Sequence, residues 1–247
     1  MTSIKDRIIV ALDVDTEREA VDLVTELGQH VWGFKVGLEL LNSVGINIVH
    51  RISTLGTQVL LDGKFNDIPS TVAGAARAVT RLAVRMFTVH TLGGLDMMKA
   101  AVEATGTEAA RLGIDRPLIL GVTVLTSLDR TMLNKELRVP GSVETQVTHL
   151  AGLADRAGLD GVVASPNEIE QIRAITAGRL LILTPGVRPS WAGVNDQKRV
   201  LTPSEAIFRG SSYLVIGRPI TKPPADIGSR IDAVKRIVQE ISIGMAN

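Results

Sequence analysis

Residues 62 to 67 of this 247-residue chain place a lysine and two acidic side chains close together, in the sequence Asp-Gly-Lys-Phe-Asn-Asp. In this string Lys64 lies between two acidic residues, Asp62 and Asp67. Acids and amines that lie close together hold one another in the charged form, because each offsets the cost of removing the other from water. An ammonium held in this way can stabilise negative charge and deliver a proton. A short string of this kind is equally compatible with a purely structural network of salt bridges.

Two arginines in the last quarter of the chain have neighbours that suit the binding of an anion. Arg188 follows Gly186 and Val187, and Arg218 directly follows Gly217. Glycine lets backbone N–H groups come close to an anion, and the guanidinium fork matches the oxygens of a phosphate. Taken alone, Arg218 fits an ion pair at the protein surface equally well.

Eight short aliphatic runs predict β-strands, and segments with helical periodicity separate them. Apolar strands that alternate with amphipathic helices are typical of a parallel sheet covered by helices. Eight such units in about 250 residues favour a single α/β domain, a (β/α)8 TIM barrel over residues 1–247, rather than an open doubly wound sheet. The predicted strands span residues 8–13, 31–36, 58–62, 86–90, 118–124, 161–164, 180–184 and 213–216.

Three of the predicted helices have clear sequence signals. After the first strand, Thr16 and Glu19 have the spacing of a capping box, and Gly28 follows the apolar stripe of the helix that begins there. Pro69 suits the first turn of the helix after the third strand. The last helix carries an apolar face between residues 227 and 241.

The ends of the predicted strands carry the polar residues. In a barrel of this kind the active site lies at the carboxyl ends of the strands. The first three strand ends carry Asp13, Lys35 and Asp62. Phosphate frequently binds to the loops after strands seven and eight, which here supply Arg188 and Arg218. This placement favours catalysis on a phosphorylated small molecule over a structural salt-bridge network.

Composition excludes several classes of function. Lysine and arginine number 27 against 26 aspartate and glutamate, so no global field attracts nucleic acid or an acidic membrane. The chain has no cysteine, which excludes disulfides, thiolate metal sites and cysteine nucleophiles and suits a reducing compartment. The N-terminus is polar, and no apolar run is long enough for a signal or a membrane span. We expect a cytoplasmic protein with neither nucleic-acid nor membrane partners.

The histidines and methionines favour structural roles. No two histidines have the spacing of metal ligands, so no metal site is expected. His90 ends the fourth predicted strand, where we expect a hydrogen-bonded structural residue rather than an acid–base catalyst. Met97 and Met98 are expected to fill the core or an interface. The chain lacks a P-loop and a dinucleotide-binding glycine motif, so neither nucleoside triphosphates nor dinucleotides are expected.

An ordered set of short motifs runs from residue 8 to about residue 220 and covers nearly the whole chain. Together these motifs resemble the bacterial orotidine 5′-monophosphate decarboxylase family. No single string is decisive, but the ordered set is highly specific. The matching segments are Ala11-Leu12-Asp13, Phe34-Lys35-Val36-Gly37, residues 61–71, Val89-His90 with Gly93-Gly94, residues 122–127, residues 184–188, Asp196-Gln197-Lys198-Arg199 and Ile216-Gly217-Arg218.

The resemblance implies a barrel without metal or cofactor, usually a homodimer. It implies decarboxylation of orotidine 5′-monophosphate (OMP) to uridine 5′-monophosphate (UMP) and CO2, the last step of de novo pyrimidine biosynthesis. By this resemblance Lys64 is the proton donor, flanked by Asp62 of its own chain and Asp67 of the partner subunit. Lys35 and Asp13 hold the ribose hydroxyls and extend the row of charges.

The resemblance also implies the remaining contacts to the nucleotide. Thr126 touches the pyrimidine, and Gln197 bridges phosphate and base from a lid over residues 186–199. The expected phosphate ligands are Arg188, Gly217 and Arg218, and the substrate contacts expected from across the dimer interface are Ile68 and Thr71.

The sequence departs from the family pattern at four positions near these residues. Asn66 and Ser70 replace a common histidine and asparagine, and Gly63 stands where a bulkier apolar residue is usual. Thr88 stands where asparagine is frequent. None of these changes removes a charged group, so they affect the expected positioning and not the expected reaction.

Two other functions are compatible with a phosphate-binding barrel. A magnesium-dependent sugar-phosphate decarboxylase or aldolase shares the Asp-x-Lys-x-x-Asp arrangement, but it needs a carboxylate where this chain has Lys35. A lysine at that position repels the cation. A non-catalytic phosphate-binding barrel explains Arg218 but leaves Lys64 between two aspartates without a purpose.

Overall fold

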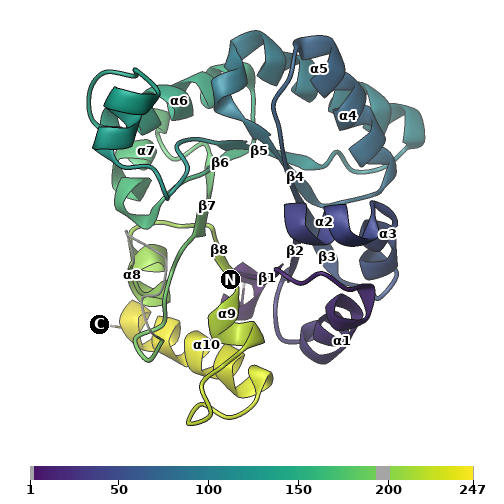
Figure 1. Ribbon diagram of the computed structural model, residues 1–247, viewed down its shortest axis with the longest axis vertical. Coiled ribbons are helices and arrows are strands. Elements are labelled where there is room, and N and C mark those ends of the chain that lie inside the picture. Colours follow the sequence, from purple (N-terminus) through teal and green to yellow (C-terminus); the bar gives the residue numbers. More distant parts are fainter. Residues whose placement is uncertain (1–2, 193–200, 247) are drawn as a thin grey trace.

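The computed structural model describes residues 3–192 and 201–246 and shows a closed barrel of eight parallel strands, ordered β1 to β8 as in the sequence. The ring closes where β1 pairs with β8, and the strands enclose the centre of the view in Figure 1. The predicted TIM barrel is confirmed, and each predicted strand is present. The strands are β1 (Ile8–Leu12), β2 (Gly33–Val36), β3 (Gln58–Phe65), β4 (Met86–His90), β5 (Leu118–Val122), β6 (Gly161–Val163), β7 (Leu181–Pro185) and β8 (Tyr213–Ile216).

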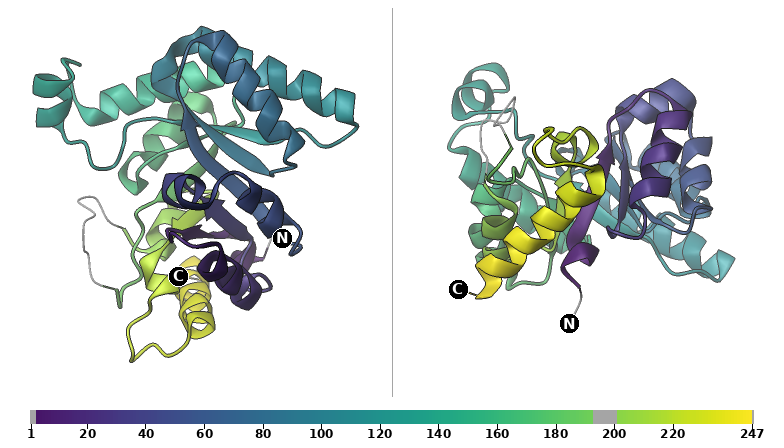
Figure 2. Two further views of the ribbon diagram at one scale, coloured as in Figure 1. Left: turned by 45° about the vertical axis from the view of Figure 1, so that its right-hand side comes forward. Right: turned by 90° about the horizontal axis from the view of Figure 1, so that it is seen from below.

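Helices surround the ring of strands, and α4 and α5 lie side by side along its outer surface (Figure 1, Figure 2). None of the helices in the described part of the chain is long and apolar enough to cross a membrane. The α-helices are α1 (Glu17–Leu27), α2 (Leu38–Val44), α3 (Asn47–Ser53), α4 (Pro69–Arg81), α5 (Gly94–Leu112), α6 (Val143–Ala157), α7 (Ile169–Thr176), α8 (Pro203–Phe208), α9 (Arg218–Thr221) and α10 (Arg230–Ala246). Short 3-10 helices span Ile4–Arg7, Thr91–Gly93 and Pro166–Glu168, and a π-helix spans Met132–Glu136.

The predicted helix signals have clear structural counterparts. The side chain of Thr16 accepts a hydrogen bond from the backbone N–H of Glu19 and caps α1, and Pro69 begins α4. Gly28 follows the last residue of α1, but its φ of −56° is an ordinary right-handed value. A Cβ at Gly28 would lie 2.9 Å from Cγ2 of Thr57, so close packing rather than backbone freedom requires glycine there.

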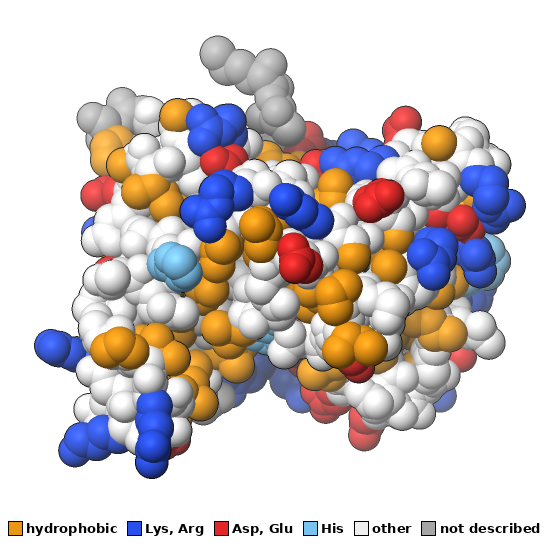
Figure 3. All heavy atoms as spheres, turned by 90° about the horizontal axis from the view of Figure 1, so that it is seen from above, with side chains coloured by type: hydrophobic (Ala, Val, Ile, Leu, Met, Phe, Trp, Pro, Cys, Tyr) orange, Lys and Arg blue, Asp and Glu red, His pale blue; other side chains and the backbone are white. Residues whose placement is uncertain are grey.

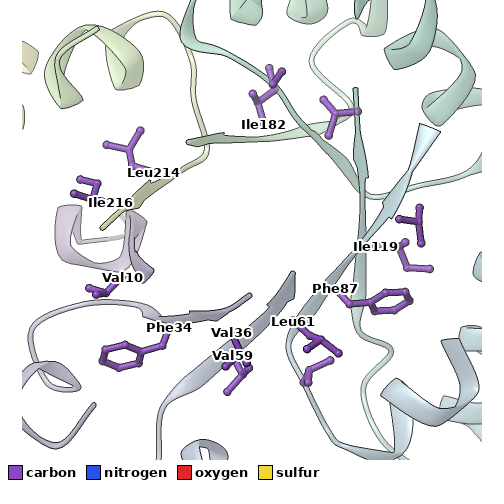
Figure 4. Close-up of a cluster of buried hydrophobic side chains, with 14 of the residues drawn as sticks. Val10, Phe34, Val36, Val59, Leu61, Phe87, Ile119, Ile182, Leu214 and Ile216 are labelled. Carbon is purple, nitrogen blue, oxygen red and sulfur yellow. The ribbon is translucent and has the colours of Figure 1, made fainter. Parts of the chain in front are cut away.

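Alternate residues of the strands pack into two different cores, because successive side chains of a strand point to opposite faces. Ile9 and Leu60 belong to a small cluster inside the barrel. Their neighbours Val10 and Leu61 belong to a larger cluster on the outer side of the ring of strands (Figure 4). Asp62 lies two residues after Leu60 on the same inner face of the strand. Its carboxylate therefore lies at the mouth of the barrel and not under the helices.

The strand that carries Lys64 differs most from its prediction. The sequence predicts a strand over residues 58–62, whereas β3 continues to Phe65. Its pairing with β4 shifts register between Leu61 and Phe65. Lys64 lies within this bulge with a φ of 48°, a left-handed value that costs a non-glycine residue about 1–3 kcal/mol. The Asp-Gly-Lys string is therefore part of an irregular strand end and not of a loop.

Charged side chains of both signs are interspersed with apolar ones on the face shown in Figure 3. This mixture agrees with the formal net charge of +1.

Candidate active site

The ends of β1, β2 and β3 bring four charged side chains into one row at the mouth of the barrel. Lys35 Nζ lies 3.2 Å from Asp13 Oδ1 and 3.6 Å from Asp62 Oδ2. Lys64 Nζ donates a hydrogen bond of 2.6 Å to the same Asp62 Oδ2. The signs alternate along the row, so each inner charge has an opposite neighbour on either side. The structure thus brings together four of the residues that the sequence singled out.

Asp62 is the centre of this row and is 9% exposed. Burial by itself raises the pKa of its carboxyl, but the positive charges of Lys35 and Lys64 reverse the effect. Hydrogen bonds from Lys64 and Thr88 contribute in the same direction, so the pKa of Asp62 lies below its ordinary value. Asp62 is therefore ionised at neutral pH and places a negative charge between the two lysines.

A cavity of about 180 Å³ opens beside the row of charges. Lys35, Asp62 and Lys64 line one side of it, and Thr126 also contributes, as the sequence predicts. The remaining lining is apolar and comes from the ends of β5 to β8 and the segments that follow β5 and β6: Val122, Val124, Leu125, Val163, Ala164, Leu183, Pro185 and Val215.

A second cavity, of about 160 Å³, shares Lys35, Pro185 and Val215 with the first. It contains the predicted anion-binding residues, because the loops after β7 and β8 meet there. Such a pair of neighbouring cavities suits a ligand with a phosphate at one end and a flat ring at the other. The other lining residues are Ala11, Asp13, Gly186, Arg188, Gly217 and Arg218.

Gly37 has a steric role that sequence reasoning missed. A Cβ at this position would lie 2.7 Å from Nζ of Lys35, closer than a side-chain carbon can approach. The glycine after β2 therefore leaves room for the ammonium group in the row of charges. The signal available in the sequence was a glycine directly after a strand that carries a lysine.

Asp67, Ile68 and Thr71 are exposed in the single chain and do not line the cavity that contains Lys64. Asp67 Oδ1 accepts a hydrogen bond of 2.7 Å from the N–H of Ile68. No ion pair joins Asp67 to Lys64 within residues 3–192 and 201–246. One chain by itself therefore does not bring these three residues to the site.

The predicted lid spans residues 186–199, of which the structure describes 186–192. Gln197 lies outside the described residues. Ser190 is bound to α10, since its backbone N–H and its hydroxyl donate to Glu240 Oε2 at 3.2 and 3.3 Å. The described part of the segment thus starts from a fixed position beside Arg188.

His90 differs from its prediction as a hydrogen-bonded residue. Its Nδ1 atom is buried and has no hydrogen-bond partner in the described structure. Burial lowers the pKa of His90, and the charge of Lys64 lowers it further against the opposing effect of Asp62. The ring stays neutral beside an ammonium, which is the reason that it needs no counter-ion. Met97 and Met98 are completely buried, and their predicted core role is confirmed.

Two departures from the family pattern have a structural explanation. A Cβ at Gly63 would lie 2.8 Å from Cε1 of Phe65, so the ring of Phe65 fills the space of the missing side chain. That ring packs against Phe87 with centroids 6.1 Å apart. Thr88 bonds to both Asp62 and Lys64, which makes it part of the charged site.

Comparison with known proteins agrees with this geometry. A family model described as the orotidine 5'-phosphate decarboxylase / HUMPS family matches residues 6–229. Orotidine 5'-phosphate decarboxylase of Heliobacterium modesticaldum is 49% identical over 242 residues, which is 98% of each chain. The enzyme of the same name from Moorella thermoacetica is 49% identical over 239 residues, 97% of this chain and 93% of its own.

Solved structures show the same similarity. The crystal structure of orotidine 5'-phosphate decarboxylase from Lactobacillus acidophilus has a TM-score of 0.82 and 34% identity, over 95% of this chain and 98% of that one. The family model and the relatives each span nearly the whole barrel, including every strand end that contributes to the site. The chain therefore belongs to the orotidine 5'-phosphate decarboxylase / HUMPS family.

Proposed function

We propose that this protein is an orotidine 5′-phosphate decarboxylase, a carboxy-lyase that converts OMP to UMP and CO2 in pyrimidine biosynthesis. The observation that carries the proposal is the row Asp13, Lys35, Asp62 and Lys64 beside a cavity lined by Arg218. Near-full-length relatives with this name support it.

The chemistry explains why a lysine between carboxylates is needed. Loss of CO2 breaks a bond to a ring carbon and leaves its electron pair in the ring plane, with no adjacent π system to accept it. The barrier must fall mainly through a fixed cation placed where the negative charge develops. The ammonium of Lys64 supplies that cation and then donates its proton to the same carbon, and solvent returns a proton to the amine.

The two neighbouring cavities suggest how the nucleotide lies. We assign the phosphate to Arg188, Gly217 and Arg218, and the pyrimidine to the cavity lined by Lys64 and Thr126. Lys35 lines both cavities, which supports its assignment with Asp13 to the ribose between them. Gln197, in the proposed lid, completes the site by bridging phosphate and base. Binding energy from the remote phosphate then helps to order the reacting group.

We further propose a homodimer in which Asp67, Ile68 and Thr71 reach the partner's site. Ile68 is 64% exposed, so its apolar side chain is accessible to a partner. A partner that covers Ile68 would also bring Asp67 toward a lysine that has one carboxylate partner in its own chain. We place this enzyme in the cytoplasm, where a chain without cysteine and with nearly balanced charge is expected.

The magnesium-dependent alternative is not favoured at this site. Lys35 Nζ lies within 3.6 Å of carboxylates on both neighbouring strands, so an ammonium takes the position between those carboxylates. Like charges repel at this distance, and a divalent ion would have to displace the lysine.

The decisive test follows the ultraviolet absorbance of OMP with the wild-type protein in excess chelator, beside Lys64→Ala. Wild-type turnover that survives chelation, with a loss of at least about 10³-fold in the variant, is the expected result. A folded wild-type protein that leaves OMP unchanged would refute the proposed function. Circular dichroism of both proteins verifies that each is folded.

A further inference from the structure

We propose that Thr88 is a positioning residue whose hydroxyl joins the backbone of Lys64 to the carboxylate of Asp62. Through these two bonds it holds the ammonium of Lys64 in place for the reaction. This inference rests on the proposed function, because it has Thr88 position Lys64, the proposed proton donor.

The hydrogen bonds around Thr88 form a closed ring. The backbone N–H of Lys64 donates to Thr88 Oγ1 at 2.9 Å, and that hydroxyl donates to Asp62 Oδ1 at 3.0 Å. Lys64 Nζ donates to the other oxygen of the same carboxylate, Oδ2, at 2.6 Å. A hydroxyl has one hydrogen to donate and lone pairs to accept, and Thr88 uses both functions here.

The register of the strands explains why a side chain must supply this acceptor. Leu61 pairs with Phe87 and Phe65 pairs with Val89, so three residues of β3, numbers 62 to 64, face only Thr88 of β4. In this bulge the N–H of Lys64 meets a side-chain oxygen in place of a carbonyl of the neighbouring strand. An N–H that is shielded from water and has no acceptor destabilises the fold, and Thr88 supplies the acceptor for this part-buried group.

Lys64 also needs support against backbone strain. Its φ of 48° is disfavoured for a residue with a side chain, and such a conformation persists only where its surroundings hold it. Thr88 is completely buried, so its own rotamer is fixed by packing. A fixed hydroxyl that binds both the backbone and the counter-ion of one lysine limits the positions that the lysine can take.

The test compares two substitutions that separate the hydroxyl from the methyl group. Thr88→Val keeps the volume and removes the hydroxyl, whereas Thr88→Ser keeps the hydroxyl and removes the methyl group. We expect kcat for OMP to fall about 10- to 100-fold in Thr88→Val, because misplacement of a reacting group has effects of this size. Binding of UMP should change less than about threefold, because its phosphate and ribose contacts lie on other strands. Thr88→Ser should keep kcat within about threefold of wild type for the same positioning reason.

A purely structural role for Thr88 predicts the opposite order. Packing alone would make Thr88→Ser, which leaves a small void, the more damaged protein. Thr184→Val is the matched control, since Thr184 is also a completely buried strand residue and its hydroxyl pairs with Ser211 Oγ at 2.7 Å, away from Lys64. That variant should keep wild-type kcat even if its melting temperature falls.

Each outcome decides between the two proposals. Wild-type kcat in folded Thr88→Val, with an active parent, would overturn the role of Thr88 and leave the proposed function intact. An inactive parent would overturn both. If Thr88→Val does not fold, Thr88→Cys replaces Thr88→Val: it has the shape of the serine variant but only a weak S–H donor. An activity of Thr88→Cys equal to that of Thr88→Ser would then reject the inference, and an activity well below it would support the inference.

Discussion

The two sides of the barrel mouth differ in chemistry although both consist of the ends of parallel strands. The side formed by β1 to β3 carries the alternating row of acids and lysines, and the opposite side, β5 to β8, is apolar where it lines the same cavity. An apolar wall lowers the local dielectric and strengthens the field of charges that face it. The apolar side therefore contributes to the electrostatics of Lys64 without carrying a charge.

The largest effect is expected when the lysine of the charged side and the carboxylate proposed to come from the partner subunit are each removed. Lys64→Ala and Asp67→Ala homodimers should each lose at least about 10³-fold in kcat, because each lacks one charged group of every site. After subunit exchange in an equal mixture, about a quarter of all sites should contain both residues, given a two-fold dimer. Absorbance of OMP before and after exchange measures the recovery.

No recovery after exchange, verified by a mass-tagged subunit, would place the action of Asp67 within one chain. Mixing Lys64→Ala with wild type tests whether a variant subunit damages the site of its partner. Activity of that mixture should follow the number of wild-type subunits.

A second prediction compares the two walls directly with nearly isosteric changes. Asp62→Asn on the charged side removes the counter-ion of two lysines and should lower kcat about 10²- to 10³-fold. Val163→Thr on the apolar side adds one hydroxyl to the opposite wall and should lower kcat less than about tenfold, since no charge is removed. Steady-state kinetics of the two variants at one pH measures the difference. Equal losses would show that the two walls contribute alike, contrary to the comparison above.

A smaller effect is expected at the phosphate cavity. Arg218→Ala should lower kcat/KM for OMP by about 1.5–3 kcal/mol, or roughly 10- to 150-fold, the value of a hydrogen bond to a charged group. Most of the loss should appear in KM. Orotidine, which lacks the phosphate, is the matched substrate, and wild type and variant should process it at the same low rate. A loss of the same size on orotidine would place the action of Arg218 elsewhere.

The smallest effect concerns a charged cluster outside the mouth. Glu108 of α5 accepts hydrogen bonds from Arg111 at 2.7 Å and from Arg81 of α4 at 2.6 Å, and these bonds lower its pKa from 4.5 to about 2. A lowered folded pKa gives stability that is present above pH 4.5 and is lost as the pH falls toward 2. Glu108→Gln should therefore melt slightly below wild type at pH 7, and the difference should shrink in acid.

Activity per folded molecule of Glu108→Gln at pH 7 should equal that of wild type. Melting curves across the acid range, recorded by circular dichroism, provide the measurement. A stability difference that does not depend on pH would mean that packing, and not the charge of Glu108, holds α4 and α5 together.

The sequence by itself determined the repeat of eight units and the position of most site residues. Periodicity marks which face of each element is buried, and that information is local. Asp13, Lys35 and Asp62 could be placed at one edge because the carboxyl ends of all strands in a parallel barrel meet there. Arg218 could be placed with them for the same reason.

Only the tertiary structure decided how these residues meet. The bulge of β3, the left-handed backbone of Lys64 and the two hydrogen bonds of Thr88 depend on the register between two strands, which a local pattern does not encode. The space that Gly37 leaves for Lys35 depends on where the lysine side chain lies over the end of its own strand. Residue types and spacing determine which groups reach the mouth of the barrel, whereas contacts between strands determine the positions those groups can hold.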